Sequence, residues 1–339
     1  MDEGSVLIFL NGPVDRLEFS LNGVFGRTAS KFEGFYSIPS NNELNFVSYR
    51  VGGSVNGGEG AFVSLILNLE ESRVLVFEWS KEEELFKLKT DEKFDKKMTD
   101  KLLEYPGLIS YKRFMEQQPE SQILWNRFTR FINKKSVMRV FSKVSLSSDS
   151  VFEVTPMLES HHSLLQGLNA ESEITVSLQF TKILSLKDYS KIPEIDSKQV
   201  TKCAMDRSVI FEYLNLNVYE LLSELQLSFL LLTFAQNFEG FEQWLDIVSL
   251  FFQSFEYAKN NVKNFKTVLE VVEEHLEMCP DDFFSGLMNE NKLFKLMTGF
   301  FIGTDGIFGD FKKFYEKKFG WIFAGDAEED PEDAPVIVE

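Results

Sequence analysis

Histidine, a residue that often holds a metal or moves a proton, is scarce in this chain. Three histidines occur among 339 residues, and two of them are adjacent, His161 and His162. Adjacent side chains point apart on a helix or a strand, so this pair predicts no two-ligand metal site and is typical of a polar linker. His275 has no second histidine four residues away, as a zinc protease would require, and is expected on the surface or in packing.

The two cysteines, Cys203 and Cys279, lie in different segments, and neither stands in a Cys-x-x-Cys context. Two such residues form no disulfide framework and indicate a reducing compartment, the cytoplasm or the nucleus. We expect both to be buried thiols rather than nucleophiles. Apolar residues 6–10 are too few for the core of a signal peptide, so no secretion signal is predicted.

Motifs of other enzyme classes are missing from the sequence. It contains neither a Gly-x-Ser-x-Gly nucleophile elbow nor a Gly-Lys-Ser/Thr phosphate loop, and Glu59 puts a carboxylate into its glycine-rich stretch at residues 57–60. No pair of carboxylates stands out for acid and base catalysis. We therefore expect no enzymatic activity, no cofactor and no bound metal. A hydrolase using His162 or His275 would instead show a pocket with a perturbed titratable cluster.

The net charge of −18 and the isoelectric point of about 4.8 set limits on partners. So acidic a chain repels a phosphate backbone, so direct binding to nucleic acid is not expected, and a basic protein partner is easier to accommodate. The most apolar stretch, residues 225–235, is shorter than the roughly 18 residues that a membrane span requires. It predicts a buried helix and no membrane association.

The elements that must position any site begin with a sheet. From residue 6 to about residue 88 the apolar period is close to two, which predicts strands over residues 6–10, 17–21, 44–49, 61–69 and 74–79. Asn11-Gly12 and Asn22-Gly23 suit turns, because both residue types tolerate a positive φ. Helices are expected at residues 91–105 and 123–132. Residues 1–160 are thus predicted to form a β-rich, sandwich-like domain with appended helices.

Helical spacing dominates the second half of the chain. Residues 161–198 are expected to be a linker with a strand near 174–183 that returns to the first sheet, since residues 174–180 alternate strictly. Residues 199–320 are predicted to be an all-α domain. Its clearest stripe recurs at spacings of three, four and seven and comprises Phe241, Trp244, Leu245, Val248, Phe251, Phe252 and Phe255. Asn217 with Glu220 predicts a capping box, Pro280 a helix start, and Gly320 a helix end.

The last residues, 321–339, differ from both domains. A nearly continuous acidic run from Asp326 gives way to the apolar tip Pro335, Val336, Ile337 and Val338. A β-competent tip on a self-repelling tether builds no core of its own. We expect these four residues to add a strand to a partner, with Val336 and Val338 facing one way and Ile337 the other.

Several blocks of sequence carry a resemblance to a known family. In the first half they are Lys31-Phe32-Glu33-Gly34-Phe35, Ile38-Pro39, Gly60-Ala61-Phe62-Val63-Ser64, Trp79-Ser80, Tyr105-Pro106 and Trp125-Asn126-Arg127-Phe128-Thr129-Arg130-Phe131-Ile132. In the second half they are Val200-Thr201-Lys202, Met205-Asp206-Arg207-Ser208, Glu224-Leu225-Gln226-Leu227-Ser228-Phe229, Gln243-Trp244 and Lys317-Lys318-Phe319-Gly320-Trp321-Ile322-Phe323. In this order they resemble the Aar-two family of splicing factors, assembly chaperones of the U-five small nuclear ribonucleoprotein (snRNP).

The resemblance implies a β-rich first domain, a second domain like the VHS superhelix of trafficking adaptors, and no enzymatic activity. It also implies a partner, the Prp-eight scaffold protein of the spliceosome, bound through its RNase H-like and Jab/MPN domains. The Brr-two helicase needs overlapping surface on that scaffold, so the two proteins are expected to compete until the U-five particle matures. The expected locations are the cytoplasm and the nucleus.

One alternative remains open from the sequence. VHS-like helical arrays also occur in membrane-trafficking adaptors, which read acidic sorting peptides or lipid headgroups. The strong negative charge disfavours a lipid surface but leaves peptide binding possible.

Overall fold

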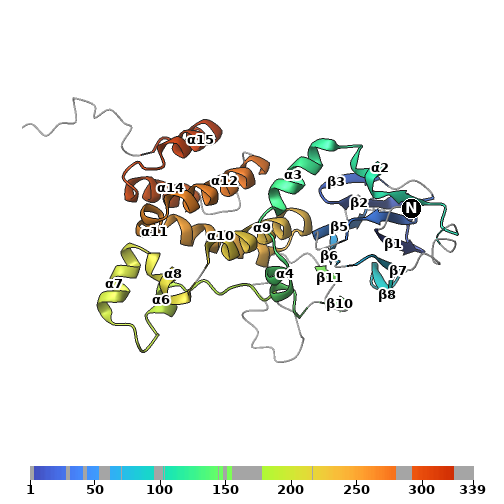
Figure 1. The fold of residues 1–339 in the computed structure, drawn as a ribbon, viewed down its shortest axis with the longest axis horizontal. Coiled ribbons are helices and arrows are strands. Elements are labelled where there is room, and N and C mark those ends of the chain that lie inside the picture. The colour runs from blue at the N-terminus through green and yellow to red at the C-terminus, as the bar shows by residue number, and fades with distance from the viewer. Residues whose placement is uncertain are drawn as a thin grey trace, which may run out of the picture. The chain divides into compact units, whose positions relative to one another are not determined.

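The chain forms two structural units. The computed structural model describes residues 4–27, 31–40, 44–52, 62–69, 71–94, 102, 104–143, 145–147, 151–154, 178–215, 217–279 and 292–323. One unit comprises Met1–Thr181 with Ser223–Trp244, and the other comprises Lys182–Leu222 with Leu245–Glu339. Two sheets lie in the first unit, and the described part of the second is helical (Figure 1), so the predicted α+β class is confirmed.

Two sheets make up the core of the first unit. The first has the strand order β8 (Leu85–Lys93), β7 (Arg73–Ser80), β1 (Ser5–Leu10), β4 (Gly34–Ile38), β9 (Leu108–Ser110). The second has the order β10 (Ser145–Ser147), β11 (Val151–Val154), β6 (Val63–Asn68), β5 (Leu44–Val51), β2 (Leu17–Leu21), β3 (Val24–Arg27). The five strands predicted from alternation are all present as β1, β2, β5, β6 and β7. The other described strands, β3, β4, β8, β9, β10 and β11, are additions that their short or charged sequences concealed.

The two sheets share one apolar core, as the sandwich-like prediction requires. Leu7 and Phe9 of β1 contribute to it together with Phe19 of β2 and Tyr49 of β5. Phe9 lies 4.9 Å from Phe19, ring centroid to ring centroid. The alternate residues of β1 point to the other face of the first sheet and pack in a smaller cluster with Val74 and Leu102. Both faces of β1 are therefore buried, as its nearly continuous apolar sequence indicates.

The turn between β2 and β3 is the predicted Asn22-Gly23 hairpin. Both residues have a positive φ, 50° and 78°, which a two-residue turn between twisted strands requires. The Asn22 side chain is buried, donates to Asn45 Oδ1 at 2.9 Å and accepts from the Phe46 backbone N–H at 2.8 Å. This asparagine thus closes the turn and also ties it to the neighbouring strand β5.

Helices α2 (Tyr111–Met115), α3 (Pro119–Thr129) and α4 (Lys134–Val140) follow the first sheet in the chain. Phe46 of the second sheet contacts Trp125 of α3, at a ring distance of 6.4 Å, and Phe234 of α9 (Val218–Ala235), at 5.9 Å. The Phe234 carbonyl accepts hydrogen bonds from the hydroxyls of Ser48 and Ser64. The second sheet therefore buries its outer face against helical segments that lie far apart in the sequence.

One predicted element of this region is wrong, and another is described only in part. Residues 91–93 of the helix expected at 91–105 belong to β8, where Asp91 pairs with Leu75 of β7, because an edge strand accepts the alternating charged residues of this segment. The strand expected near 174–183 lies outside the described residues up to 177, and residues 178–183 form no strand. Their N–H groups bond instead to the Val140 carbonyl and to the carboxylates of Glu224 and Glu239.

The second unit consists, in its described part, of short and medium helices. They are α6 (Leu186–Tyr189), α7 (Ser197–Met205), α8 (Ser208–Leu214), α11 (Phe255–Asn260), α12 (Val262–Met278), α14 (Lys292–Gly303) and α15 (Gly309–Phe319), with the ends of α9 and of α10 (Phe238–Phe252). The VHS likeness and the exact limits of the predicted domains remain predictions.

The residues predicted to begin or end helices have different outcomes in the structure. Gly320 ends α15 with a φ of 65°, as predicted. Pro280 lies outside the described residues. Asn217 accepts a hydrogen bond from the Tyr219 backbone N–H at the start of α9, and a full capping box at Asp196 and Gln199, which the sequence analysis did not predict, begins α7. The acidic residue of that box made it less visible in the sequence than the serine or threonine of the usual pattern.

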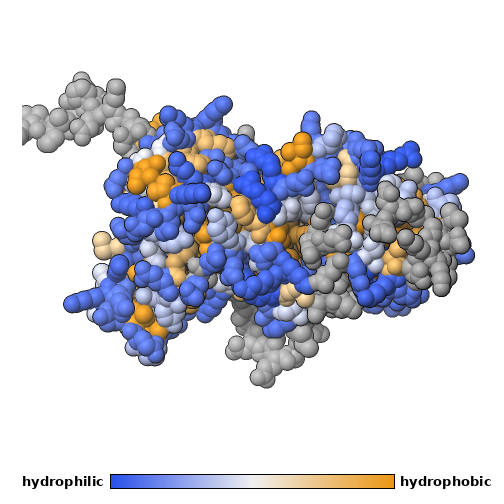
Figure 2. Space-filling model, in the orientation of Figure 1, coloured by the Kyte–Doolittle hydropathy of each residue, from blue (hydrophilic) through white to orange (hydrophobic). Residues whose placement is uncertain are grey.

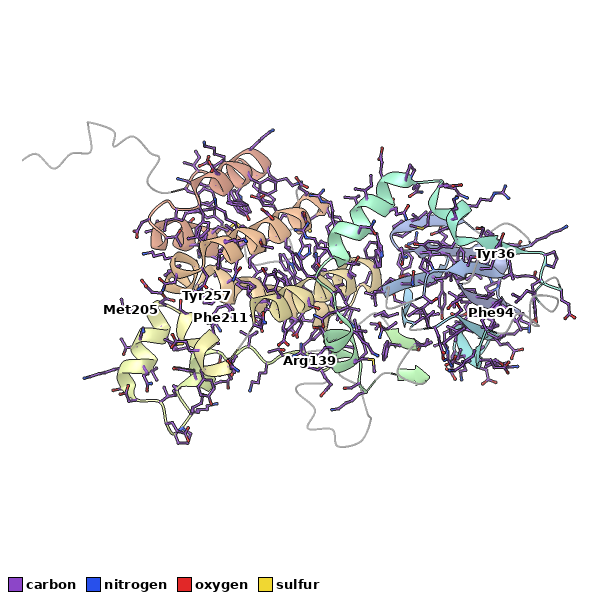
Figure 3. The ribbon with its side chains drawn as sticks, in the orientation of Figure 1. Tyr36, Phe94, Arg139, Met205, Phe211 and Tyr257 are labelled. Atoms are coloured by element: carbon purple, nitrogen blue, oxygen red, sulfur yellow. The ribbon has the colours of Figure 1, made fainter. Side chains whose placement is uncertain are left out.

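Phenylalanine rings fill the interior of the helical unit. Phe265 of α12 stacks on Phe300 of α14 at 5.1 Å and contacts Phe251 of α10 at 5.9 Å. Phe211 and Tyr257 stack at 4.2 Å and lie side by side in Figure 3. Of the stripe predicted along residues 241–255, four are fully buried, Trp244, Val248, Phe251 and Phe252, so its interpretation as core is confirmed.

One described helix, α9, is apolar and long enough to cross a membrane by length and composition. In the folded chain, 78% of that stretch is buried, as in a helix of a protein core. The visible surface in Figure 2 is mostly hydrophilic, with separate hydrophobic patches.

Candidate functional site

The residues that could do chemistry are placed by the structure as follows. His161 and His162 lie outside the described residues. His275 is fully buried on α12, so packing is its role rather than surface exposure. Among the described residues, no three histidine, cysteine, aspartate or glutamate side chains come together as metal ligands would.

Both cysteines are free and buried, as predicted from the sequence. Burial raises the pKa of Cys203. Burial, offset in part by the nearby Lys318, raises the pKa of Cys279 to about 12. A thiol with a raised pKa is almost entirely protonated near neutral pH and is a poor nucleophile. Neither position therefore favours nucleophilic catalysis.

The most perturbed carboxyl with a defined pKa is Glu273 on α12. Burial, and then repulsion by Glu277, Glu270 and Glu274, raises its pKa to about 7. Burial also raises the pKa of the Tyr315 hydroxyl well above its usual value. Neither residue lines the two pockets described below, so the raised pKa values reflect burial inside the helical unit.

The most recognisable sequence block, residues 224–229, builds a clamp in the first unit. Glu224 is fully buried and accepts hydrogen bonds from the Thr181 backbone N–H at 2.7 Å, the Thr181 hydroxyl at 2.9 Å and Gln243 Nε2 at 2.7 Å. It also pairs with the guanidinium of Arg139, which lies on α4 in Figure 3. The pKa of Glu224 is raised by burial and lowered by these donors. We name these four residues the Glu224 clamp.

The same helix makes further polar contacts with the loop after α3. Gln226 accepts from the Phe131 backbone N–H at 2.8 Å and donates to the Arg127 carbonyl at 2.8 Å. Ser223 accepts from the Asn133 backbone N–H at 3.1 Å. These polar side chains sit in a buried helix because they satisfy backbone groups that would otherwise lose water without a partner. The block is therefore structural, which its sequence alone did not indicate.

A second block, Met205-Asp206-Arg207-Ser208, forms the turn between α7 and α8. Asp206 accepts from the backbone N–H groups of Ser208 and Glu256, both at 2.8 Å, and Ser208 accepts from the Tyr257 backbone N–H at 2.8 Å. The Arg207 backbone N–H donates to the Gln253 carbonyl at 2.8 Å. The block thus fastens this turn to the junction between α10 and α11.

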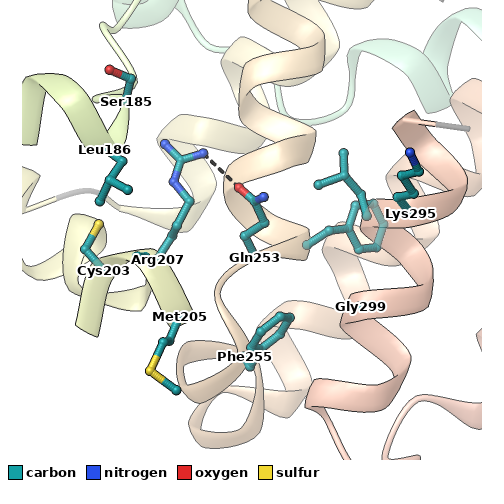
Figure 4. Close-up of a pocket in the computed structure, with 12 residues that line it drawn as sticks. Ser185, Leu186, Cys203, Met205, Arg207, Gln253, Phe255, Lys295 and Gly299 are labelled. Atoms are coloured by element: carbon teal, nitrogen blue, oxygen red, sulfur yellow. Dashed lines mark hydrogen bonds between the residues drawn. The ribbon is translucent and has the colours of Figure 1, made fainter. Parts of the chain in front are cut away.

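Each unit contains a surface pocket. In the first unit a pocket of about 410 Å³ lies between α3 and the strands, with a polar lining that includes Asn22, Tyr111 and Gln122. In the second unit a larger pocket of about 590 Å³ opens between α7 and α14 (Figure 4). We name it the α7/α14 pocket. It is lined by Ser185, Leu186, Cys203, Ala204, Met205, Arg207, Phe252, Gln253, Phe255, Lys295, Leu296 and Gly299.

Sequence reasoning found Arg207 only as part of a family block and missed Lys295 and Gly299. A glycine at position 299, inside an otherwise apolar helical pattern, was the one available signal. The predicted strand residues Pro335, Val336, Ile337 and Val338 lie outside the described residues. The described chain ends at Phe323, a buried ring that contacts Phe301 at 5.1 Å.

Comparisons with known proteins agree with the sequence resemblance along both halves of the chain. The family model of the AAR2 N-terminal domain matches residues 3–142, and that of the AAR2 C-terminal repeat region matches residues 180–324. The chain is also similar to the Protein AAR2 homolog of Caenorhabditis elegans, with 24% identity over 94% of this chain and 95% of that protein. The two family models together cover most of the sequence, and the chain therefore belongs to the AAR2 (Aar-two) family.

Proposed function

We propose that this protein is a non-enzymatic assembly chaperone of the U-five snRNP. Membership in the AAR2 family indicates a splicing-related factor, and the match of both family models is the observation that carries the proposal. The proposed partner is the Prp-eight scaffold, bound through its RNase H-like and Jab/MPN domains. Occupying that surface would exclude the Brr-two helicase until maturation, in the cytoplasm and then in the nucleus.

The geometry of the described residues supports a binding role. The two most conspicuous polar blocks, the Glu224 clamp and the Asp206 to Ser208 turn, use their side chains to bond backbone and side-chain groups of the protein itself. The cysteine thiols have raised pKa values, and Glu273, whose pKa is raised to about 7, lines neither of the two described pockets. These polar residues therefore hold each unit together from within, which supports a role in binding a partner rather than in catalysis.

The tail supplies the second part of the proposal. Residues 335–338 would add a strand to the scaffold, with main-chain hydrogen bonds giving affinity and alternate side chains giving register. Ordering the tail costs roughly 1 to 2 kcal/mol per residue, so most of the affinity would come from the folded units. The tail would then act as a removable latch.

Calorimetry with the purified RNase H-like and Jab/MPN fragments tests both parts. The full chain is expected to bind, and Val338→Pro is expected to weaken binding by about 10-fold, because one ladder hydrogen bond and one buried valine are lost. Asp333→Pro, in the acidic run, is the matched control and should bind like the parent chain. Absence of binding by the full chain would refute the partner, and equal affinity of both variants would refute the strand.

The comparisons give no support to the trafficking adaptor considered from the sequence. Flotation of the full chain with anionic vesicles separates the two functions. Retention on the vesicles together with no binding to the scaffold fragments would favour the adaptor.

A further inference from the structure

The α7/α14 pocket is apolar in its floor and positively charged at its sides. Arg207 and Lys295 lie on opposite sides of it, with Gln253 between them (Figure 4), and no aspartate or glutamate is among its lining residues. In a chain with a net charge of −18, such a pocket is unusual. Its charge favours an acidic ligand, and its apolar floor favours a ligand with apolar side chains.

The contacts of both cations are consistent with an anionic ligand. The Arg207 guanidinium donates to neutral acceptors, Gln253 Oε1 at 3.1 Å and the Leu184 carbonyl. Burial lowers the pKa of Arg207, while Cys203 and Asp246 offset this in part. Lys295 is exposed and forms no ion pair with any residue that the structure describes. A carboxylate entering the pocket would therefore meet positive charge that no lining carboxylate neutralises.

Gly299 gives the pocket its depth. A Cβ atom placed on this glycine would meet no atom within 4 Å, so packing inside the protein does not require a glycine there. A glycine inside a helix makes the helix less stable than alanine would. Since packing does not require glycine at this position, we ascribe it to the open space of the pocket. Lys295, Gly299 and Ile302 follow at spacings of four and three, so they share one face of α14. Ile302 is 59% exposed, and Met205 across the pocket is 76% exposed.

The chain carries a segment with the matching chemistry. The 16 residues after Phe323 contain seven acidic residues and no lysine or arginine, and they include the apolar tip at residues 335–338. Phe323 packs on Phe294, the residue next to Lys295, at a ring distance of 5.6 Å. An extended segment of 16 residues reaches about 50 Å, and the path around half a helix is under about 20 Å. The tip can therefore reach the pocket on the far side of α14.

We propose that the acidic tail of this chain occupies the α7/α14 pocket of the same molecule. The apolar tip lies on Met205 and Leu296, and the tail carboxylates face Lys295 and Arg207. A tethered segment has an effective concentration in the millimolar range, so a weak contact is enough to hold it and it releases readily. The inference rests on the proposed function in one respect: the tip must leave this pocket before it adds a strand to the scaffold.

Paramagnetic relaxation in the full chain tests the proposal without any scaffold. A nitroxide is attached at Glu339→Cys, since Cys203 and Cys279 are buried, and the methyl signals of Met205 and Leu296 are recorded. We expect each signal to fall to below half of its intensity with the reduced label. Gly299→Trp, whose indole would occupy the open pocket in place of the tail, should restore both signals. Gly309→Trp places the same side chain at another open glycine and should leave the loss unchanged.

Three results would overturn the proposal. Undiminished methyl signals in the labelled parent chain would show that the tail is elsewhere. A loss that persists in Gly299→Trp would place the tail outside the pocket. In a third sample, isotope-labelled chains without nitroxide are mixed with unlabelled chains that carry the nitroxide. A loss of methyl signal in this mixture would show that the tail occupies the pocket of a second copy. Because no scaffold takes part, these outcomes are independent of whether the scaffold proposal holds.

Discussion

Replacing Glu273 by glutamine should stabilise the protein at alkaline pH and leave it unchanged in mild acid. Glu273 lies on α12, and one of its carboxyl oxygens, Oε1, is buried without a hydrogen-bond partner among the described residues. Its pKa is raised from 4.5 to about 7 by burial first and then by Glu277, Glu270 and Glu274. Glutamine has nearly the same shape and no charge, so it removes both causes at once.

The sign of this effect on stability follows from whether the folded or the unfolded chain holds the proton. Below about pH 4.5 the carboxyl is protonated in both states, and no stability is lost. Between pH 4.5 and 7 the unfolded chain releases the proton while the folded chain retains it, so folding loses free energy as the pH rises. The difference in pKa corresponds to about 3.4 kcal/mol at 1.36 kcal/mol per pH unit. Solvent screening of this half-buried side chain reduces it to about 1 to 2 kcal/mol.

Urea unfolding monitored by circular dichroism at pH 5 and at pH 8 measures the effect. Glu273→Gln is expected to gain about 1 to 2 kcal/mol at pH 8 and less than about 0.5 kcal/mol at pH 5. Glu194→Gln, at an exposed glutamate of the same unit, is the matched control and should change neither value by more than about 0.5 kcal/mol. An equal gain at both pH values, or a loss at pH 8, would refute the assignment of a buried, repelled carboxyl.

Three further predictions concern single residues. Glu224→Leu should lower the free energy of unfolding by about 3 to 5 kcal/mol in urea, because it strands the buried donors of the Glu224 clamp; a loss below about 1 kcal/mol would contradict the clamp. Gly320→Ala should lower the free energy of unfolding by about 1 kcal/mol, because residue 320 has a φ of 65°. Gly299→Ala should raise the free energy of unfolding by about 0.5 to 1 kcal/mol. Thermal unfolding of both variants measures the two changes, and changes of the same sign would contradict this pair of predictions. Ellman titration should detect no fast thiol in the folded protein and two in urea, and rapid reaction of Cys203 or Cys279 in the folded protein would contradict their burial.

The sequence predicted those parts of the fold in which a single local period dominates. The strand at residues 17–21 is β2 with the same limits, and the stripe along residues 241–255 is buried as expected. Strand β8 was missed because its alternation joins charged with apolar residues at a sheet edge, a pattern that a helix also satisfies. The segment at residues 178–183 was assigned to a sheet because strict alternation cannot reveal that helix carboxylates supply its acceptors.

The candidate site was less predictable than the fold. Arg207 lies far in the sequence from Lys295 and Gly299 of α14, and it meets them only because the turn between α7 and α8 lies across the pocket from that helix. The polar residues Glu224 and Gln226 in an apolar run were the one strong local signal, and they proved to hold backbone groups together. Tertiary partners of this kind are absent from any local pattern.

A competition measurement tests the central claim most directly. The purified full chain is bound to the scaffold fragment that carries the RNase H-like and Jab/MPN domains, and the Brr-two helicase is then added while both complexes are followed by sedimentation. We expect each complex to exclude the other partner, so that the helicase binds only as this protein leaves. Failure of the chain to bind the fragment, or a stable complex of all three proteins, would contradict it.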